Sequence, residues 1–289
     1  MADFLADSSI EPIAGEPGRY RAELSPRWAV WGPNGGYLAA IALRAAMAQS
    51  RVSRPANFHC HFLAVGEFAA VDIRVVSLGG GKRAESLRVE IMQGERLLLA
   101  ATAWMVSDGL QGFTHDFGAM PQVPAPHALR GYQELSEDYD QWYPIWRSME
   151  GRPVRWREAP GRPESRTWLR FTETPIPDRQ ADALRQLFWL DFPGWNATIS
   201  AHQWPFRFLA PNLDLTVQFH RFVPHETWML ADGVALLAED GLVGCVSRLW
   251  GEDGRLLATG TSHHVSRPNP GYEQELQRAR EMGLIPPDA

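Results

Sequence analysis

The chain of 289 residues is predicted to have an α+β fold made of two copies of one unit, each an antiparallel sheet wrapped around a long apolar helix. Two observations predict this class. When the sequence is shifted along itself by about 159 positions, His61 falls on His220 and Arg96 on Arg255, within the similar strings GERLLLAATAWMV and DGRLLATGTSHHV. In each half, an apolar helix precedes strands whose residues alternate between apolar and polar. A repeat this long indicates a domain duplication, since solenoid repeats are much shorter.

The first unit is assigned to residues 1–110. It begins with one or two aromatic-rich strands over about 18–31, after which Asn34 is predicted to cap a helix that extends to about residue 49. This helix is composed almost entirely of Ala, Leu, Ile and Met, which is typical of a helix surrounded by other elements. The segment 87–91 then alternates apolar and charged residues, as in an antiparallel sheet with one face in water.

The second unit, assigned to residues 166–267, repeats this order. A strand over 167–172 precedes a helix over about 179–191, for which Asp178 is the predicted cap. The strands expected after it cover about 213–222, 227–238, 241–250 and 255–266. A strand, an apolar helix and then an antiparallel sheet around that helix make up the hotdog arrangement, so the whole chain is predicted to be a double hotdog.

Two further segments lie outside the repeated units. Residues 111–165 are rich in Pro, Gly and charge, and are predicted to be an inter-domain linker that packs over both units. Residues 268–289 are predicted to form a peripheral tail with a short charged helix over about 272–282.

The composition excludes several classes of function. The net charge of −6 argues against a broad nucleic-acid surface, and no apolar run is long enough to span a membrane. With only Cys60 and Cys245 and no signal-peptide pattern at the start, a reducing, cytoplasmic location is expected. Beyond His59 and His61 no further ligands stand at a usual metal spacing, so no metal site is expected. Neither a G-x-S-x-G elbow nor a phosphate-binding or dinucleotide-binding motif is present.

Several segments resemble, in order and spacing, one known family over residues about 17–267. These are WGPNGGYLAAIALRAA, PANFHCHFLAVGE, the Pro-rich MPQVPAP and RPVRWRE, LFWLDF with NLDLTVQFHR, and RLLATGTSHHVSR. They resemble the type II acyl-CoA thioesterases, which are double-hotdog proteins of lipid metabolism. The resemblance implies hydrolysis of acyl-CoA to a free acid and CoA by direct attack of water, without an acyl-enzyme. It implies no cofactor other than the CoA of the substrate.

The resemblance also implies a catalytic set that holds the water. The family's Asp matches Asp191, its Ser or Thr position is Asn212, and its Gln position is Ser262. Asp191 follows Leu187 and Phe188 on the apolar stripe of its helix, where burial should raise its pKa and make it a general base or water anchor. The alternative is a helix-end Asp that faces solvent.

The other two positions depart from the family pattern. Asn212 still has a donor and an acceptor for a water molecule, although Pro211-Asn212 also fits an ordinary turn. Ser262 is too short to reach the water that a Gln would hold. Strand alternation puts His264 on the same face as Ser262, where it could fill the gap that the shorter side chain leaves; an edge position without a catalytic role is the favoured expectation for this histidine.

A second group of residues is predicted to bind substrate. The amides of Asn34, Gly35, Gly36 and Tyr37 at the start of the first helix could stabilise the oxyanion of the thioester, or the segment could be a plain Gly-rich turn. His59 matches a family histidine near the active site, with a structural role as the alternative. Lys82 and Arg83, on the turn after three glycines, could hold a CoA phosphate or simply lie on a surface hairpin.

Three functions remain open on the sequence alone. The first is acyl-CoA hydrolysis, and the second is non-catalytic binding of acyl-CoA or an acyl chain by a protein that keeps the fold. The third is a hydratase or dehydratase, which would need an Asp/His pair that the sequence does not reveal. The expected partner is acyl-CoA rather than nucleic acid, and assembly into a homo-oligomer of double-hotdog subunits is left open.

Overall fold

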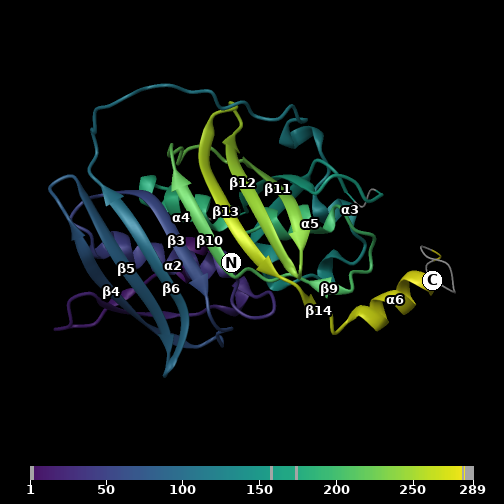
Figure 1. Cartoon of the computed structure of the whole chain (residues 1–289), viewed down its shortest axis with the longest axis horizontal. Coiled ribbons are helices and arrows are strands. Elements are labelled where there is room, and N and C mark those ends of the chain that lie inside the picture. The colour runs from purple at the N-terminus through teal and green to yellow at the C-terminus, as the bar shows by residue number, and fades with distance from the viewer. Residues whose placement is uncertain (1–2, 157–158, 173–174, 282, 284–289) are drawn as a thin grey trace.

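The computed structural model describes residues 3–156, 159–172, 175–281 and 283, and it consists of two similar halves side by side (Figure 1). The elements of the N-terminal half are α1 (Phe4–Asp7), β1 (Glu11–Pro12), β2 (Arg19–Glu23), η1 (Pro26–Trp28), α2 (Gly35–Gln49), β3 (Arg54–Phe62), β4 (Ala70–Gly80), β5 (Ala84–Gln93) and β6 (Arg96–Val106). Those of the C-terminal half are β8 (Glu164–Phe171), α4 (Arg179–Leu190), α5 (Pro193–Ile199), β9 (Phe208–Leu209), β10 (Asp214–Phe219), β11 (Met229–Glu239), β12 (Leu242–Gly251), β13 (Leu256–Val265), β14 (Arg267–Pro268) and α6 (Tyr272–Glu281).

The strand order confirms the double hotdog. One twelve-stranded sheet has the order β1-β2-β4-β5-β6-β3-β10-β13-β12-β11-β8-β7. Read outward from its centre, β3-β6-β5-β4-β2 in one half corresponds to β10-β13-β12-β11-β8 in the other. The two predicted sheets are therefore joined edge to edge, because β3 and β10 pair antiparallel with His59 opposite Thr216. A small second sheet contains only β14 and β9.

The two long helices begin as the sequence predicts. Asn34 caps α2 by accepting a hydrogen bond from Tyr37 N, and Asp178 caps α4 by accepting one from Ala181 N. Each cap spans three residues, which is the usual geometry of an Asn or Asp N-cap. Both helices lie behind the sheet in Figure 1, and most residues of each are buried.

The helices pack against each other in opposite directions, so that the start of α2 meets the end of α4. The side chains enclosed between helices and sheet form one continuous core that includes Trp28, Phe58, Phe188 and Trp189. The prediction that each long helix is apolar needs correction for α4. Its residues Asp182 and Arg185 are also buried, and they form an ion pair at 2.5 Å. The loop after β10 covers this side of the helix. The backbone oxygen of its Val223 accepts a hydrogen bond from Arg185, and the Val223 N–H donates one to Asp182.

The linker contacts both halves. It contains η2 (Pro126–Ala128), α3 (Tyr132–Leu135), η3 (Tyr139–Gln141), η4 (Pro144–Ser148) and β7 (Met149–Pro153). Helix η4 packs on η1 of the N-terminal half, while β7 pairs with β8 of the C-terminal half. Residues 157–158 of the predicted linker, and residue 282 with 284–289 of the predicted tail, lie outside the described residues. Among the described residues, no helix is long and apolar enough to cross a membrane.

Candidate active site

The end of α4 and the start of α2 meet at one corner of the molecule, with Asp191 at its centre. Asp191 is the C-cap of α4. Its Oδ2 accepts hydrogen bonds from Asn34 Nδ2 at 3.0 Å and from the Gly36 backbone N–H at 2.9 Å. Its Oδ1 accepts one from Asn212 Nδ2 at 2.6 Å. We call Asp191, Asn34, Gly35, Gly36 and Asn212 the Asp191 corner; the sequence singled out all five, and three separate segments supply them.

Two glycines allow α2 to approach Asp191 this closely. A Cβ built on Gly36 would lie 3.0 Å from both the Asp191 Cβ and the Phe188 backbone oxygen. A Cβ on Gly35 would lie 3.2 Å from Asp191 Oδ1 and 3.0 Å from Phe62 Cζ. Any larger side chain would therefore push the two helices apart and lengthen the bonds to the carboxylate. The glycine pair serves this close contact rather than a turn with unusual backbone angles.

The first amide groups of α2 are used in different ways. Tyr37 N donates to the Asn34 cap, and Gly36 N donates to Asp191. The Gly35 N–H donates to none of the described residues, so it remains free to bind a ligand. The side chain of Tyr37 lies away from the corner, because it is fully buried and its hydroxyl donates to Asp7 O at 2.6 Å.

Burial raises the pKa of Asp191 above the usual range of an aspartate. The hydrogen bonds from Gly36, Asn34 and Asn212 act in the opposite direction, and the loss of solvation outweighs them. The residue nevertheless remains partly exposed at the surface of the corner. A poorly solvated carboxylate with a raised pKa is suited to accept a proton from a water molecule that reaches it.

Ser262 lies on β13 with its side chain turned towards the helices, and its hydroxyl is bonded elsewhere. Ser262 Oγ is 3.0 Å from His264 Nε2, and His264 Nδ1 is 3.0 Å from Ala210 O. The expected edge position of His264 is wrong, because the residue is completely buried. Helix α5 covers it, a contact that sequence spacing did not reveal. The alternation along β13, which places Ser262 and His264 on the same inner face, was the sequence signal that could have revealed this burial.

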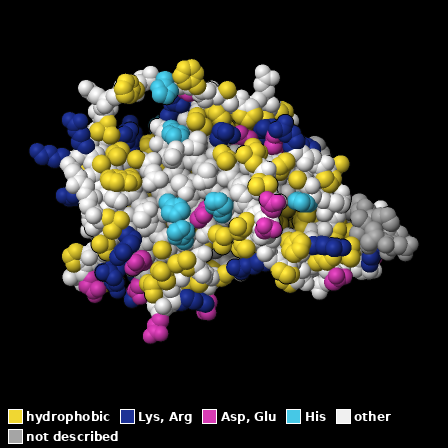
Figure 2. Space-filling model, in the orientation of Figure 1, with side chains coloured by type: hydrophobic (Ala, Val, Ile, Leu, Met, Phe, Trp, Pro, Cys, Tyr) yellow, Lys and Arg dark blue, Asp and Glu magenta, His cyan; other side chains and the backbone are white. Residues whose placement is uncertain are grey.

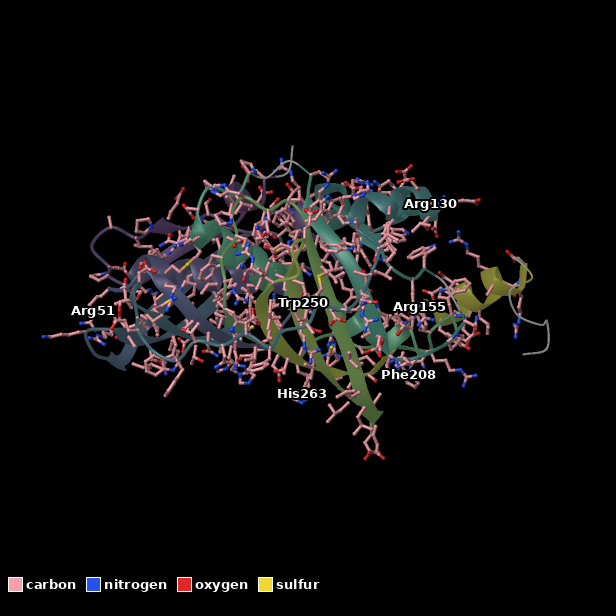
Figure 3. All side chains as sticks on the ribbon, turned by 90° about the horizontal axis from the view of Figure 1, so that it is seen from above. Arg51, Arg130, Arg155, Phe208, Trp250 and His263 are labelled. Carbon is pink, nitrogen blue, oxygen red and sulfur yellow. The ribbon has the colours of Figure 1, made fainter. Side chains whose placement is uncertain are left out.

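The structure does not bring His59 to the Asp191 corner. Phe58 and Cys60 point into the core, so His59 lies on the outer face of the sheet, where it contacts Thr216 Oγ1 at 2.8 Å and His61 Nε2 at 3.2 Å. Figure 2 shows histidine side chains around an acidic one near the middle of this face. Asp214 contacts the side chain of His263 at 3.1 Å, and Figure 3 shows His263 on the outer side of the sheet.

Lys82 and Arg83 also lie away from the Asp191 corner. Their turn leads into Ala84, which pairs with Val106 of β6. Val106 in turn pairs with Arg54 at the start of β3. The other end of β3, at Phe62, touches the corner. The two places are therefore separated by the length of a nine-residue strand, roughly 26 Å at about 3.3 Å per residue. A bound CoA would have to span that distance to reach both.

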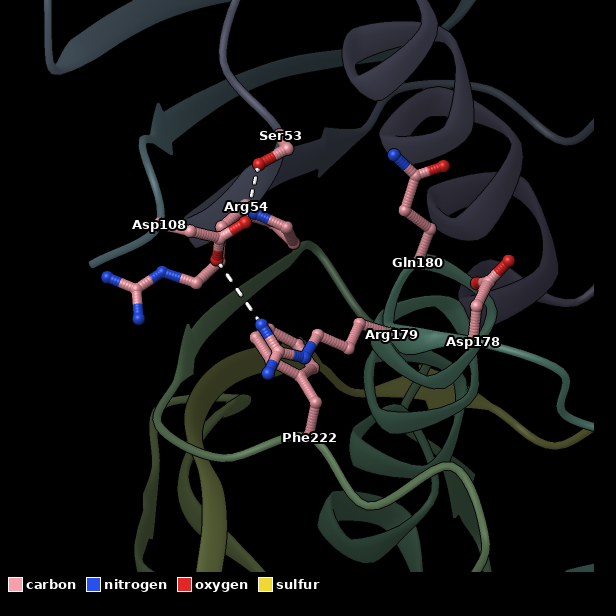
Figure 4. A pocket seen from close by; sticks show the side chains of 8 residues that line it. Ser53, Arg54, Asp108, Asp178, Arg179, Gln180 and Phe222 are labelled. Carbon is pink, nitrogen blue, oxygen red and sulfur yellow. Dashed lines mark hydrogen bonds and ion pairs between the residues drawn. The ribbon is translucent and has the colours of Figure 1, made fainter.

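A cavity of about 290 Å³ occupies the place that the internal repeat makes equivalent to the Asp191 corner (Figure 4). It lies at the N-terminal end of α4, where Asp178 is the cap that corresponds to Asn34. The C-cap of α2 is Ser50, whereas that of α4 is Asp191. The charged side chains that line the cavity balance in sign: they are Arg54, Arg179, Asp108 and Asp178. The carboxylate at a helix C-terminus thus distinguishes the Asp191 corner from its counterpart.

No metal site accompanies the Asp191 corner: the described residues contain no group of three or more His, Cys, Asp or Glu side chains able to hold an ion. The corner itself offers one carboxylate, two amide side chains and the backbone amides of a helix N-terminus. Such a set can hold a water molecule and accept its proton, and it can stabilise negative charge that develops beside the helix.

Comparisons with known proteins agree with this architecture. A family model described as the acyl-CoA thioesterase N-terminal domain matches residues 24–106, and one described as the acyl-CoA thioesterase C-terminal domain matches residues 116–265. The boundary between the two matches falls at the start of the linker. No curated protein is detectably similar to the chain in sequence.

Solved structures share the fold over most of the chain. A conserved protein of unknown function with a hotdog fold from Alicyclobacillus acidocaldarius superposes with a TM-score of 0.79 at 19% identity, over 92% of this chain and 98% of that one. A putative thioesterase II from Thermobifida fusca gives 0.76 at 20% identity, and an acyl-CoA thioesterase II from Mycobacterium marinum gives 0.74 at 20%, each with the same coverage. At these identities the likeness establishes the double hotdog.

Proposed function

Because the chain belongs to the type II acyl-CoA thioesterase family, we propose that it hydrolyses acyl-CoA to a free acid and CoA by direct attack of water at the Asp191 corner. The observation that carries this assignment is the environment of Asp191. Its carboxylate has a raised pKa and lies against the N-terminus of a helix whose first amide donates to none of the described residues, and the residue as a whole is partly exposed. A general base therefore stands beside a site for the oxyanion.

The proposed roles follow from the hydrogen bonds. The ionised Asp191 accepts a proton from the attacking water, while the side chain of Asn212 holds the carboxylate in place at 2.6 Å. As the water oxygen bonds to the thioester carbon, the carbonyl oxygen becomes negative and receives a hydrogen bond from the Gly35 N–H. When the C–S bond breaks, the proton held by Asp191 passes to the departing sulfur, which leaves as the CoA thiol. All atoms of water are then accounted for in the two products.

Asn34 has a supporting role in this scheme. Its side-chain oxygen caps α2 at Tyr37 N, and its nitrogen donates to Asp191 Oδ2. One amide thus ties the start of α2 to the general base. Because Oδ2 is occupied by two donors, Oδ1, which receives only Asn212, is the oxygen proposed to face the water.

A thiol-release assay over acyl chain lengths tests the proposal. Purified protein should release one free thiol for each acyl-CoA consumed. Non-catalytic binding of acyl-CoA is the second candidate, favoured by one observation: the Ser262 hydroxyl is bonded to His264 instead of being offered to a water molecule. Saturable binding of a fluorescent acyl-CoA without any thiol release would establish that candidate and overturn hydrolysis.

Rapid quenching tests the absence of an acyl-enzyme. With substrate in excess over protein, CoA and free acid should appear together from the first turnover. A burst of CoA that precedes the acid, up to one equivalent per chain, would show that a protein group attacks the thioester before water does.

A further inference from the structure

Ser262 and His264 form a buried polar pair within the C-terminal half. The side chains are 4% and 0% exposed, respectively. The backbone oxygen of Ala210 can only accept a hydrogen bond, so His264 Nδ1 carries the proton and donates to it at 3.0 Å. In the neutral ring Nε2 then accepts from the Ser262 hydroxyl at 3.0 Å. Burial lowers the pKa of His264, which favours this neutral form.

Through Ala210, the ring holds the segment that carries Asn212. Asn212 forms an isolated antiparallel bridge with His264. On either side of that bridge, Val265 N donates to Pro211 O at 3.1 Å and Leu213 N donates to His263 O at 2.7 Å. The His264 side chain adds the bond to Ala210, between this bridge and the β9–β14 pairing. The ring thus supplies one of the hydrogen bonds that hold the segment whose Asn212 amide binds Asp191 at 2.6 Å.

The same ring also fixes the chain just after Asp191. Gly194, in the first turn of α5, packs directly on it: a Cβ at this glycine would lie 2.2 Å from His264 Nε2 and 3.1 Å from Ser262 Oγ. Gly194 follows Asp191 by only three positions in the chain. One imidazole thus contacts both chain segments whose side chains meet in the Asp191–Asn212 bond.

The internal repeat shows that the fold itself does not require this pair. Shifted by the same offset of about 159 positions, Ser262 and His264 correspond to Ala103 and Met105 on β6. Both are fully buried and apolar. The polar pair occurs in the half that holds Asn212 against Asp191, and apolar side chains take its place in the other half.

We propose that His264, bound to Ser262 and Ala210, is a positioning residue that sets the Asn212–Asp191 contact for hydrolysis. This inference rests on the proposed function, because its effect on turnover presupposes a reaction at Asp191. It gives Ser262 a role through His264 instead of a direct contact with the attacking water. It also explains how the corner dispenses with the longer side chain at position 262 that the family resemblance implied.

The variant His264→Met tests the proposal with the residue that the N-terminal half uses at the equivalent position. It removes the bond to Ala210 while filling the space with an apolar chain. We expect kcat to fall about 10- to 100-fold, because a small displacement of a reacting group lowers the rate by that order. KM should change less than about threefold. His264→Asn places an amide nitrogen near the Nδ1 position, so it should recover most of the lost kcat. His263→Met, the same change on the outer face of β13, should leave kcat unchanged.

A second readout does not depend on activity. In protein labelled with ¹⁵N-asparagine, the side-chain amide signal of Asn212, identified by its loss in Asn212→Ala, should shift in His264→Met and return in His264→Asn. If wild-type protein hydrolyses no acyl-CoA, the proposed function fails while this signal still reports on positioning. An unshifted Asn212 signal, a kcat no lower than that of His263→Met, or a lower melting temperature at unchanged kcat would each overturn the positioning role.

Discussion

Replacing Asp191 with Asn should remove most of the turnover and keep the fold. The amide has nearly the shape of the carboxylate but cannot accept a proton from water. A positioned general base contributes about 10²–10⁴-fold in rate. At about 1.4 kcal/mol per factor of ten, this corresponds to roughly 3–5 kcal/mol of lost transition-state stabilisation. KM should change little, because the ground-state substrate is not bound through this proton transfer.

The expected stability of Asp191→Asn follows from the balance at the corner. The hydrogen bonds from Gly36, Asn34 and Asn212 favour the charged carboxylate, yet the pKa of Asp191 is raised, so the loss of solvation outweighs them. Removing the charge therefore relieves an unfavourable term. Asn212 can rotate its amide to accept a bond from the new NH₂ group. The melting temperature should be unchanged or higher.

Thiol release and thermal melting, measured on the same preparations, check both expectations. Asp214→Asn is the matched control, since it makes the same change on the outer face of the neighbouring strand, beside His263. Its kcat should equal that of the wild type. The reasoning is refuted if Asp191→Asn keeps turnover within about threefold of the wild type. It is also refuted if Asp214→Asn loses as much turnover as Asp191→Asn.

Three further predictions concern pH, helix contact and the distant turn. The kcat/KM of the wild type should fall on the acid side with a midpoint above 3.8, the usual pKa of Asp, because only the ionised Asp191 acts as base. Since the folded-state pKa of Asp191 is raised, the folded protein binds this proton more tightly than the unfolded chain. The contribution of Asp191 to the free energy of unfolding should therefore decline as pH rises through that pKa. Urea unfolding of the wild type and of Asp191→Asn over a range of pH measures this decline, and identical curves would contradict it. Gly36→Ala should cost about 1–3 kcal/mol of stability and lower kcat, because its Cβ meets the Phe188 backbone oxygen at 3.0 Å; urea unfolding and thiol release check this, and unchanged values would show that the helices can separate freely. Lys82→Ala combined with Arg83→Ala should leave KM unchanged, because the turn lies beside the opposite end of β3 from the Asp191 corner; a raised KM would support the CoA-phosphate role that the sequence suggested.

The sequence predicted the elements that local chemistry determines. Asn34 and Asp178 are N-caps three residues before the amide they bind, and this pattern is visible in the chain. The alternation of strands such as β5 and the internal repeat predicted the double hotdog without any knowledge of contacts. Asp191 was predicted at an apolar helix face with a raised pKa, and both features follow from spacing along a single helix.

Contacts between distant segments could not be predicted in the same way. The pairing of β3 with β10 joins two sheets through edges that look like any other strand edges in sequence. Burial of Asp182 and Arg185 depends on a loop about forty residues further along the chain. Lys82 and Arg83 suit a phosphate by type, but only the register of the sheet shows which end they occupy. The burial of His264 could not be predicted either, because it depends on helix α5 packing over this residue.

A crystal structure with a non-hydrolysable acyl-CoA analogue, in which a methylene group replaces the thioester sulfur, tests the central claim most directly. The account predicts that the carbonyl carbon lies beside Asp191 Oδ1, with its oxygen within hydrogen-bond distance of the Gly35 N–H. An analogue whose carbonyl is seated instead at the opposite end of the helices, in the cavity lined by Asp108 and Arg179, would contradict the assignment of the active site.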